Sequence, residues 1–226
     1  MSTHIKFMHI IDVKNIDEAV NAAKNILNEI FGLKGINNIA FTGGRFGESI
    51  VSSFDPRYIT KNSQIFQTDE RFVEYDDEDC IQRSLMRNLS ESGIKPDPSQ
   101  LNFFKLGTSY LESINSMTDL LEQKQINAFD LVFLSLGEDG HLAGDFKNYD
   151  LTVDNKICYT ENANKPPNKR ISYTASWLLN SDHIFLAAVG KEKEKAFDDF
   201  ICGKGIHSAK INYDKNIIVL KDKNFK

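Results

Sequence analysis

The sequence of 226 residues is long enough to bury a hydrophobic core in one large domain or two small ones. Its net charge of −5, with no block of lysines and arginines, argues against nucleic acids and anionic membranes as partners. No apolar run is long enough to span a membrane, and residues 1–15 lack the pattern of a signal peptide. The three cysteines are far apart and form no CxxC pair, which favours reduced thiols and a cytoplasmic protein.

Short apolar strands alternate with amphipathic helices along the chain. In chain order, the pattern predicts a helix at 17–32, strands at 36–44 and 63–71, helices at 78–93 and 108–125, and strands at 129–137, 181–190 and 216–220. The proline-rich stretches 94–100 and 161–170 are predicted loops. We therefore predict an α/β fold with a mainly parallel, doubly wound, Rossmann-like sheet that carries helices on both faces.

Four of the predicted strands end in polar or glycine-bearing turns. These turns are TGGRFG (42–47), TDER (68–71), GEDGH (137–141) and VGKEK (189–193). Any α/β protein needs such turns to end its strands, so one of them alone indicates nothing. Because ligands of open parallel sheets bind at the carboxyl ends of the strands, four together favour one shared site.

The first turn has the composition of an anion site. Thr42, Gly43 and Gly44 follow an apolar strand and could open a helix, whose free N–H groups favour an anion. The turn matches neither the dinucleotide pattern GxGxxG nor the Walker loop, so no nucleotide is implied, and a plain tight turn is the alternative. In the second turn, Arg71 could reach an anionic ligand while Asp69 accepts a hydroxyl group or a proton. A surface ion-paired turn is the alternative there.

His141 is the histidine of the sequence that lies in a glycine-flanked acidic loop. The neighbouring carboxylates and glycines make it the best candidate for a general base, although a lone histidine is more often structural. The sequence has no HExxH, HxH or CxxC spacing, so no metal site is predicted, and a loose site formed by Asp139, His141 and Asp145 is disfavoured. There is also no GxSxG motif for a serine nucleophile.

Taken together, five motifs resemble those of the 6-phosphogluconolactonases. GEDGHLAGDF resembles the GxGxDGHTASLFP segment of that family, TGGRFG stands where the family has SGGSTP, and TDERFV resembles its DER-V segment. NKPPNKRISYT is similar to its KPPxxRIT loop, and VGKEKEKAF to its GxxKxxA turn. The order is the same, over residues from about 36 to 200. Glucosamine-6-phosphate deaminases belong to the same superfamily and share the sheet, the glycine turn and the DGH loop.

The resemblance implies a sugar-phosphate site without a metal or an organic cofactor, and a sugar-phosphate lactone as the small-molecule substrate. His141 would activate water, Asp139 would orient or polarise it, and Asp69 would complete the catalytic set. The phosphate would be held by Thr42, Gly43, Gly44, Arg170 and Lys193, and Arg71 would bind the phosphate or the sugar-acid end. Arg45, which the family pattern lacks, is a further expected binding residue because it adds a cation beside the glycine turn. On this basis we expect residues 1–226 to form a single lactonase-like domain with a small β-containing insertion, acting as a monomer or weak homodimer.

The sequence departs from the family pattern at several positions and leaves alternatives open. Arg45, Phe46 and Gly47 replace Ser-Thr-Pro, Ile81 replaces an asparagine, and Leu142, Gly144 and Asp145 replace Thr, Ser and Leu. A deaminase or isomerase is the second hypothesis; the deaminases carry a carboxylate five positions after the histidine, where this sequence has Phe146, as in the lactonases. A non-catalytic sugar-phosphate sensor is the third, although the sequence has no room for a helix-turn-helix before the first matched strand.

Overall fold

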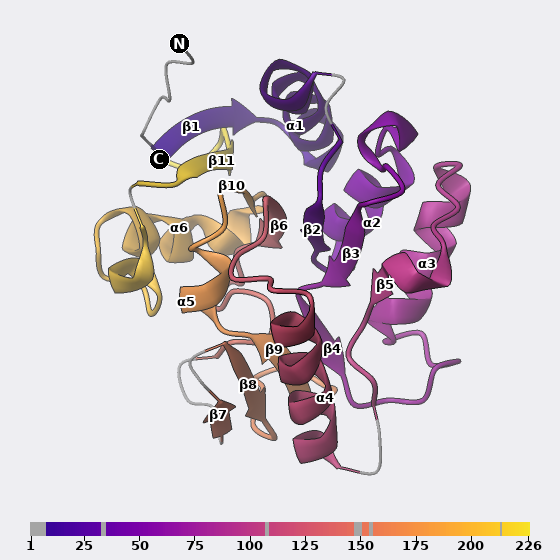
Figure 1. The fold of residues 1–226 in the computed structure, drawn as a ribbon. Coiled ribbons are helices and arrows are strands. Elements are labelled where there is room, and N and C mark those ends of the chain that lie inside the picture. The colour runs from indigo at the N-terminus through magenta and orange to yellow at the C-terminus, as the bar shows by residue number, and fades with distance from the viewer. Residues whose placement is uncertain (1–7, 33–34, 107–108, 147–150, 154–155, 213) are drawn as a thin grey trace.

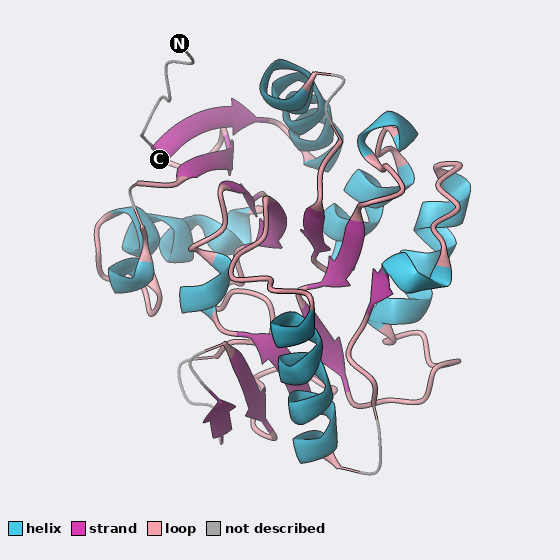
Figure 2. Cartoon of the chain, viewed as in Figure 1, coloured by secondary structure: helices cyan, strands magenta, loops and turns pink. Residues whose placement is uncertain are grey.

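The computed structural model describes residues 8–32, 35–106, 109–146, 151–153, 156–212 and 214–226 (Figures 1 and 2). In this part of the chain a seven-stranded parallel sheet forms the centre, in the order β1-β11-β10-β6-β2-β3-β5. Its strands are β1 (Met8–Val13), β2 (Asn38–Phe41), β3 (Gln64–Gln67), β5 (Leu101–Asn102), β6 (Leu131–Ser135), β10 (His183–Ala188) and β11 (Asn216–Asp222).

Helices cover both faces of this sheet (Figure 2). They are α1 (Ile16–Phe31), α2 (Gly44–Ser52), α3 (Ile81–Glu91), α4 (Tyr110–Gln123), α5 (Ala175–Leu178) and α6 (Glu194–Ile201). The side chains of β6 alternate between the faces, because successive residues of a strand point in opposite directions. Leu131 and Phe133 pack into the cluster formed with α1, α2 and α3, whereas Val132 and Leu134 pack into the cluster formed with α4, α5 and α6. The doubly wound α/β fold predicted from the sequence is thereby confirmed.

The first helix illustrates how the sequence sets the ends of these elements. Asn15 caps the start of α1, where its side chain accepts a hydrogen bond from the backbone N–H of Glu18 at 2.9 Å. At the other end Gly32 adopts φ +56° and donates its N–H to Asn28. Glycine adopts this left-handed conformation at little cost, so the helix stops where the sequence predicts.

A second, antiparallel sheet packs below the first in the order β4-β9-β8-β7 (Figure 1). Its strands are β4 (Asp69–Arg71), β7 (Leu151–Val153), β8 (Ile157–Thr160) and β9 (Arg170–Tyr173). The two sheets share one hydrophobic cluster, in which Ile171 and Tyr173 lie with Val132 and Leu134. This sheet is the β-containing insertion, and it brings Asp69, Arg71 and Arg170 to the carboxyl ends of the large sheet.

One predicted strand is wrong in its extent. Residues 63–71 were expected to form a single strand, but the structure divides them into β3 in the large sheet and β4 in the small one. The division falls at Thr68, whose N–H still donates to Phe41 of β2 while its carbonyl accepts from Tyr173 of β9. Thr68 therefore joins the two sheets, because its N–H group bonds to a strand of the large sheet and its carbonyl to a strand of the small one.

The other predicted helices and strands are present. Most are slightly shorter than predicted, but β11 extends two residues beyond 216–220 and α1 is shifted by one residue from 17–32. Arg170, at the end of the predicted loop 161–170, begins β9. Residue 108, the first of a predicted helix, and residues 1–7 lie outside the described residues. Among the residues that the structure describes, no helix is long and apolar enough to cross a membrane.

Candidate active site

A pocket of about 290 Å³ opens at the carboxyl ends of β2, β6 and β10, next to β4 and β9. The four polar turns that follow distant strands in the sequence contribute to its wall, so the structure brings them together as the topology of the sheet predicts. Asp139, in contrast, does not line the pocket but lies behind His141. The expected site residues that line the pocket are Thr42, Gly43, Gly44, Arg45, Asp69, Arg71, His141, Arg170 and Lys193.

The loop after β6 folds back on itself and presents His141 to the pocket. The N–H of Gly137 donates to the carbonyl of His141 at 2.9 Å, which closes the turn. Gly140 adopts φ +88°, a conformation that side chains other than glycine rarely adopt. A Cβ atom at Gly137 would lie 2.2 Å from Nδ1 of His141, so glycine is required there for the imidazole to occupy its place.

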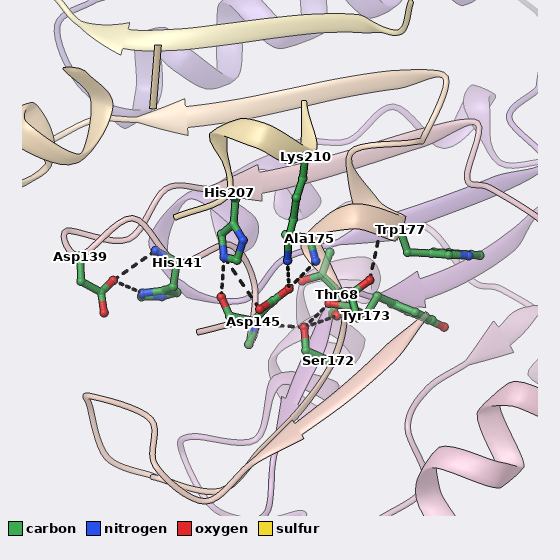
Figure 3. A network of polar contacts seen from close by, with 12 residues as sticks. Thr68, Asp139, His141, Asp145, Ser172, Tyr173, Ala175, Trp177, His207 and Lys210 are labelled. Atoms are coloured by element: carbon green, nitrogen blue, oxygen red, sulfur yellow. Dashed lines mark hydrogen bonds and ion pairs between the residues drawn. The ribbon is translucent and has the colours of Figure 1, made fainter. Parts of the chain in front are cut away.

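Asp139 fixes the imidazole of His141 from the side away from the pocket (Figure 3). Nδ1 of His141 lies 2.5 Å from Oδ1 of Asp139, and Oδ2 of Asp139 accepts a hydrogen bond from Asn164. When Nδ1 carries the proton, it donates to the carboxylate and leaves Nε2 with its lone pair. This is the tautomer that a general base requires.

The surroundings of Asp139 keep it charged. Burial alone would raise the pKa of its carboxyl group, but hydrogen bonds from His141 and Asn164 and the charge of the imidazole outweigh burial and hold the pKa well below its usual range. The carboxylate therefore remains an acceptor for Nδ1 throughout the neutral and mildly acidic range.

We expect the variant Asp139→Asn to reveal this charge in the pH dependence of stability. Because the pKa of Asp139 is lower in the folded state, ionised Asp139 stabilises the fold above its unfolded pKa of about 4, and this contribution is lost as the pH falls below that value. The difference in melting temperature between the wild type and the variant should be largest near neutral pH and shrink below about pH 4. Thermal unfolding followed from pH 3 to 8 measures it, and a difference that is constant over this range would contradict the assignment.

Phe146 packs against the other side of the histidine. Its ring is stacked on the imidazole of His141 with centroids 4.4 Å apart and an interplanar angle of 30°. The phenylalanine is buried and lines the pocket. It therefore holds the imidazole in place, and it presents an apolar ring where the deaminases carry a carboxylate.

Two cations in the pocket wall, the buried Arg170 and the half-buried Lys193, have no carboxylate partner among the described residues. Nε and Nη2 of Arg170 donate to the carbonyls of Pro167 and Lys165, at 2.7 and 3.3 Å. Nζ of Lys193 donates to the hydroxyl of Ser135 at 2.9 Å. Burial lowers the pKa of both Arg170 and Lys193. Because buried charges are costly without a counter-ion, this arrangement favours an anionic ligand.

Arg71 is held more firmly than these two cations. Its Nη1 donates to the backbone carbonyl and to the side chain of Asp79, at 3.0 and 2.8 Å, while its buried Nε has no hydrogen-bond partner among the described residues. The guanidinium is thus oriented by Asp79, with donors left for a ligand. Arg45 differs, because its side chain is 83% exposed and lies 4.0 Å from Glu192 at the rim of the pocket.

Asp69 and Glu70 of the TDER turn are buried, so its interpretation as a surface turn is wrong, although Arg71 forms an ion pair with Asp79. Asp69 lines the pocket and is only 4% exposed, with its Oδ1 accepting a hydrogen bond from the hydroxyl of Thr68 at 2.7 Å. Glu70 is buried as well and accepts the backbone N–H groups of Ile81 and Gln82 at the start of α3. Asp69 therefore faces the ligand space, while Glu70 caps a helix.

The glycine turn places the start of a helix at the pocket. Gly43 is the N-cap of α2 and Gly44 its first residue, so no side chain caps the first N–H groups of this nine-residue helix. The positive end of the helix dipole adds to the positive charge of the cations that line the pocket. The tight-turn alternative is not what the structure shows, because the turn opens a helix as the anion-site hypothesis requires.

Several further residues of the pocket wall were not among the predicted site residues. Ser135 is the last residue of β6, where a hydroxyl after four apolar residues was the available signal. Others begin α3, lie in the turns after β6 and β10, or belong to the loop before β9. These residues are Ile81, Glu138, Lys165, Pro166 and Glu192. Within the described part of the chain, no three histidine, cysteine, aspartate or glutamate side chains come close enough to share a metal ion.

Comparison with known proteins places these features in a family. The sequence pattern of the family described as glucosamine-6-phosphate isomerases/6-phosphogluconolactonase matches residues 13–216. The chain belongs to this family. A 6-phosphogluconolactonase of Borreliella burgdorferi is 28% identical over 172 residues, which cover 73% of this chain and 72% of that protein. A 6-phosphogluconolactonase of Synechocystis is 23% identical over 192 residues, with 81% and 79% covered.

Solved structures of family members share the fold. The 6-phosphogluconolactonase from Trypanosoma cruzi superposes with a TM-score of 0.82 at 18% identity, over 99% of this chain and 98% of that one. The structure of the Thermotoga maritima 6-phosphogluconolactonase gives a TM-score of 0.78 at 17% identity, over 95% and 99%. The two-sheet architecture is therefore that of the family.

Against the family pattern, two of the departures lie in the pocket itself. Arg45 adds a cation at the rim, and Ile81 takes the place of an asparagine and packs against Gly43. A third departure, Asp145, is fully buried behind the histidine loop. These changes leave Asp69, His141, Arg170 and Lys193 in the pocket wall.

Proposed function

We propose that this chain hydrolyses 6-phospho-D-glucono-1,5-lactone to 6-phosphogluconate, a step of the oxidative pentose phosphate pathway. The observation that carries the proposal is the pairing of His141 with Asp139 at a pocket whose wall also holds Arg170 and Lys193, two cations without a carboxylate partner among the described residues. A general base beside an anion site matches a phosphorylated ester that is opened by water. The names of the family members described above point to the same reaction.

In the proposed mechanism His141 activates a water molecule. Nε2 takes a proton as the water oxygen adds to the lactone carbonyl carbon, and the charge that this creates on the imidazole is stabilised by Asp139. The ring C–O bond then breaks, and His141 returns the proton to the departing ring oxygen. The new carboxylic acid ionises at neutral pH, so one proton is released per turnover. No covalent bond to the protein forms in either half.

The phosphate of the substrate would lie among the cations and the start of α2. Arg170 and Lys193 would supply charge, Arg71 would bind the phosphate or the sugar-acid end, and backbone N–H groups of the glycine turn would donate to it. Asp69 would accept a hydroxyl group of the sugar. Binding at a distance from the carbonyl orients the lactone toward His141 and thereby raises the rate.

A deaminase of the same family is disfavoured by one observation. Phe146 occupies the place five residues after His141 and is stacked on the imidazole, so no carboxylate is available there to assist ring opening of an amino sugar. We also propose that the protein acts in the cytoplasm as a monomer or weak homodimer.

The proposed function is tested by a continuous assay with freshly made 6-phosphogluconolactone, in which the proton released is titrated and the spontaneous hydrolysis is subtracted. We expect the wild type to accelerate hydrolysis and to release no ammonia from glucosamine-6-phosphate. Ammonia release would favour the deaminase. Binding of 6-phosphogluconate without acceleration of either reaction would favour the sensor.

We expect Arg170→Ala and Lys193→Ala to raise KM for the lactone by about tenfold or more each, with a smaller change in kcat, because a remote cation stabilises the bound substrate and the transition state alike. Calorimetric titration with 6-phosphogluconate measures the same loss without turnover. Lys195→Ala on the outer face of α6, whose side chain is 85% exposed, is the control and should bind normally. Unchanged affinity in both pocket variants would contradict the phosphate assignment.

A further inference from the structure

Asp145 is a fully buried carboxylate four residues after His141, and the proposed chemistry does not use it (Figure 3). Its Oδ2 accepts the backbone N–H of Ala175 at 2.7 Å and lies 3.4 Å from Nζ of Lys210. Its Oδ1 has no hydrogen-bond partner among the described residues. A buried charge with an unsatisfied oxygen costs free energy, so its presence calls for a physical reason.

His207 holds the same residue through the main chain. Its buried Nε2 donates to the backbone carbonyl of Asp145 at 2.8 Å and lies 3.9 Å from Oδ1. Burial lowers the pKa of His207, which favours the neutral ring with its proton on Nε2. His207 and Lys210, both from the segment after α6, thus form a clamp on Asp145. His207 binds its backbone carbonyl and Lys210 its carboxylate.

The clamped residue lies within the loop that carries the imidazole. Leu142 makes antiparallel backbone bridges with both Leu136 and Asp145, so the two arms of the loop are joined. Phe146, the next residue after Asp145, is stacked on His141. The position of Asp145 therefore sets the position of the ring against which the imidazole rests.

We propose that Asp145 is a positioning residue for His141, held in place by its ion pair with Lys210 and its hydrogen bond from His207. The inference rests on the proposed function, in which His141 is the base. Release of Asp145 shifts Phe146 and lets the imidazole turn away from Asp139. The chemical step then slows, whereas sugar-phosphate binding by cations on other segments of the chain is preserved.

The test uses two substitutions of the ion pair, Asp145→Asn and Lys210→Met. We expect each to lower kcat by about ten- to a hundredfold, because misplacement of a catalytic group by about 1 Å has effects of this size. KM and the affinity for 6-phosphogluconate should stay within about twofold. His207→Gln keeps an N–H donor for the carbonyl of Asp145 and should remain near the wild type, whereas His207→Leu should lose kcat.

A second ion pair in the chain supplies the matched control. Nζ of Lys215 lies 2.7 Å from Oδ1 of Asp182, next to the amino end of β10 and away from the pocket. Asp182→Asn and Lys215→Met should leave kcat unchanged. A downfield proton NMR signal from Nδ1–H of His141, bonded to Asp139, gives a readout without substrate; it should persist in these controls and broaden or vanish in Asp145→Asn.

Folded Asp145→Asn and Lys210→Met proteins with wild-type kcat and an intact Nδ1–H signal would overturn the inference. Equal loss of kcat in His207→Gln and His207→Leu would also contradict it, since the retained donor would then have no effect. If Asp145→Asn fails to fold, Lys210→Met and the His207 pair decide the question. A wild type without lactonase activity would instead refute the proposed function, and the NMR signal would still test whether Asp145 positions His141.

Discussion

Replacement of His141 by asparagine is expected to lower kcat for lactone hydrolysis by about 10²- to 10⁴-fold, the contribution of a positioned general base. Asparagine approximates the shape of the imidazole up to Nδ1 and can still donate to Asp139, but it cannot take a proton from water at Nε2. Binding of 6-phosphogluconate should change little, because the cations of the pocket remain. Steady-state kinetics together with calorimetric titration separate the two effects.

The control for this variant is His9→Asn, on the exposed side of the edge strand β1 and outside the pocket. It should retain wild-type kinetics. A His141→Asn protein with the wild-type kcat would make the histidine structural, the alternative left open by the sequence.

Gly137→Ala is expected to lower kcat by about a hundredfold although it adds only one methyl group. The new Cβ would lie 2.2 Å from Nδ1 of His141, so the imidazole has to move. The imidazole is also stacked on Phe146, with ring centroids 4.4 Å apart, so a displacement of the imidazole disturbs this contact as well. The imidazole should therefore leave Asp139, while the affinity for 6-phosphogluconate falls much less.

Gly203→Ala provides the comparison for Gly137→Ala. Gly203 has φ +75°, and a Cβ there meets no other atom within 4 Å, so alanine strains the backbone without a clash. We expect a loss of stability of about 1 kcal/mol and an unchanged kcat. Equal activity of the two alanine variants would show that the imidazole tolerates displacement and would weaken its assignment as the base.

The sequence predicted the large sheet well because its inner strands are rich in apolar residues, and three of them, β2, β6 and β10, are followed by glycines within two residues. In β6, the run from Leu131 to Leu134 is buried on both faces, so a continuous apolar stretch marked it. The edge strand β1 was not predicted, since Ile10 is exposed and the alternation of its side chains is weak. Strand β5 is only two residues long and has no pattern to recognise.

Site residues were predictable where the interacting side chains lie within a single tight turn. His141 and Asp139 lie in such a turn, and their contact needs only the tight fold of residues 137–141. Contacts between distant segments were not predictable from local patterns. The hydrogen bond from Lys193 to Ser135 joins residues 58 positions apart, and it depends on the order of strands in the sheet.

For Asp145, local spacing in the sequence suggested a role that its distant contacts in the structure do not support. From the sequence it was a disfavoured metal ligand beside Asp139 and His141, because its spacing alone suggested a shared site. The structure turns its carboxylate away from His141 toward Ala175 and Lys210. Segments 30 and 65 residues later in the chain supply those partners, so no local pattern could reveal its surroundings.

Proton and phosphorus NMR time courses of freshly prepared 6-phosphogluconolactone test the central claim most directly. The lactone is followed in buffer alone, with the wild type and with His141→Asn, at equal protein concentration and one pH. We predict rapid conversion of the δ-lactone to 6-phosphogluconate by the wild type, and a rate close to that of buffer for His141→Asn. Identical rates in buffer and with the folded wild type would contradict the assignment of this chain as a lactonase.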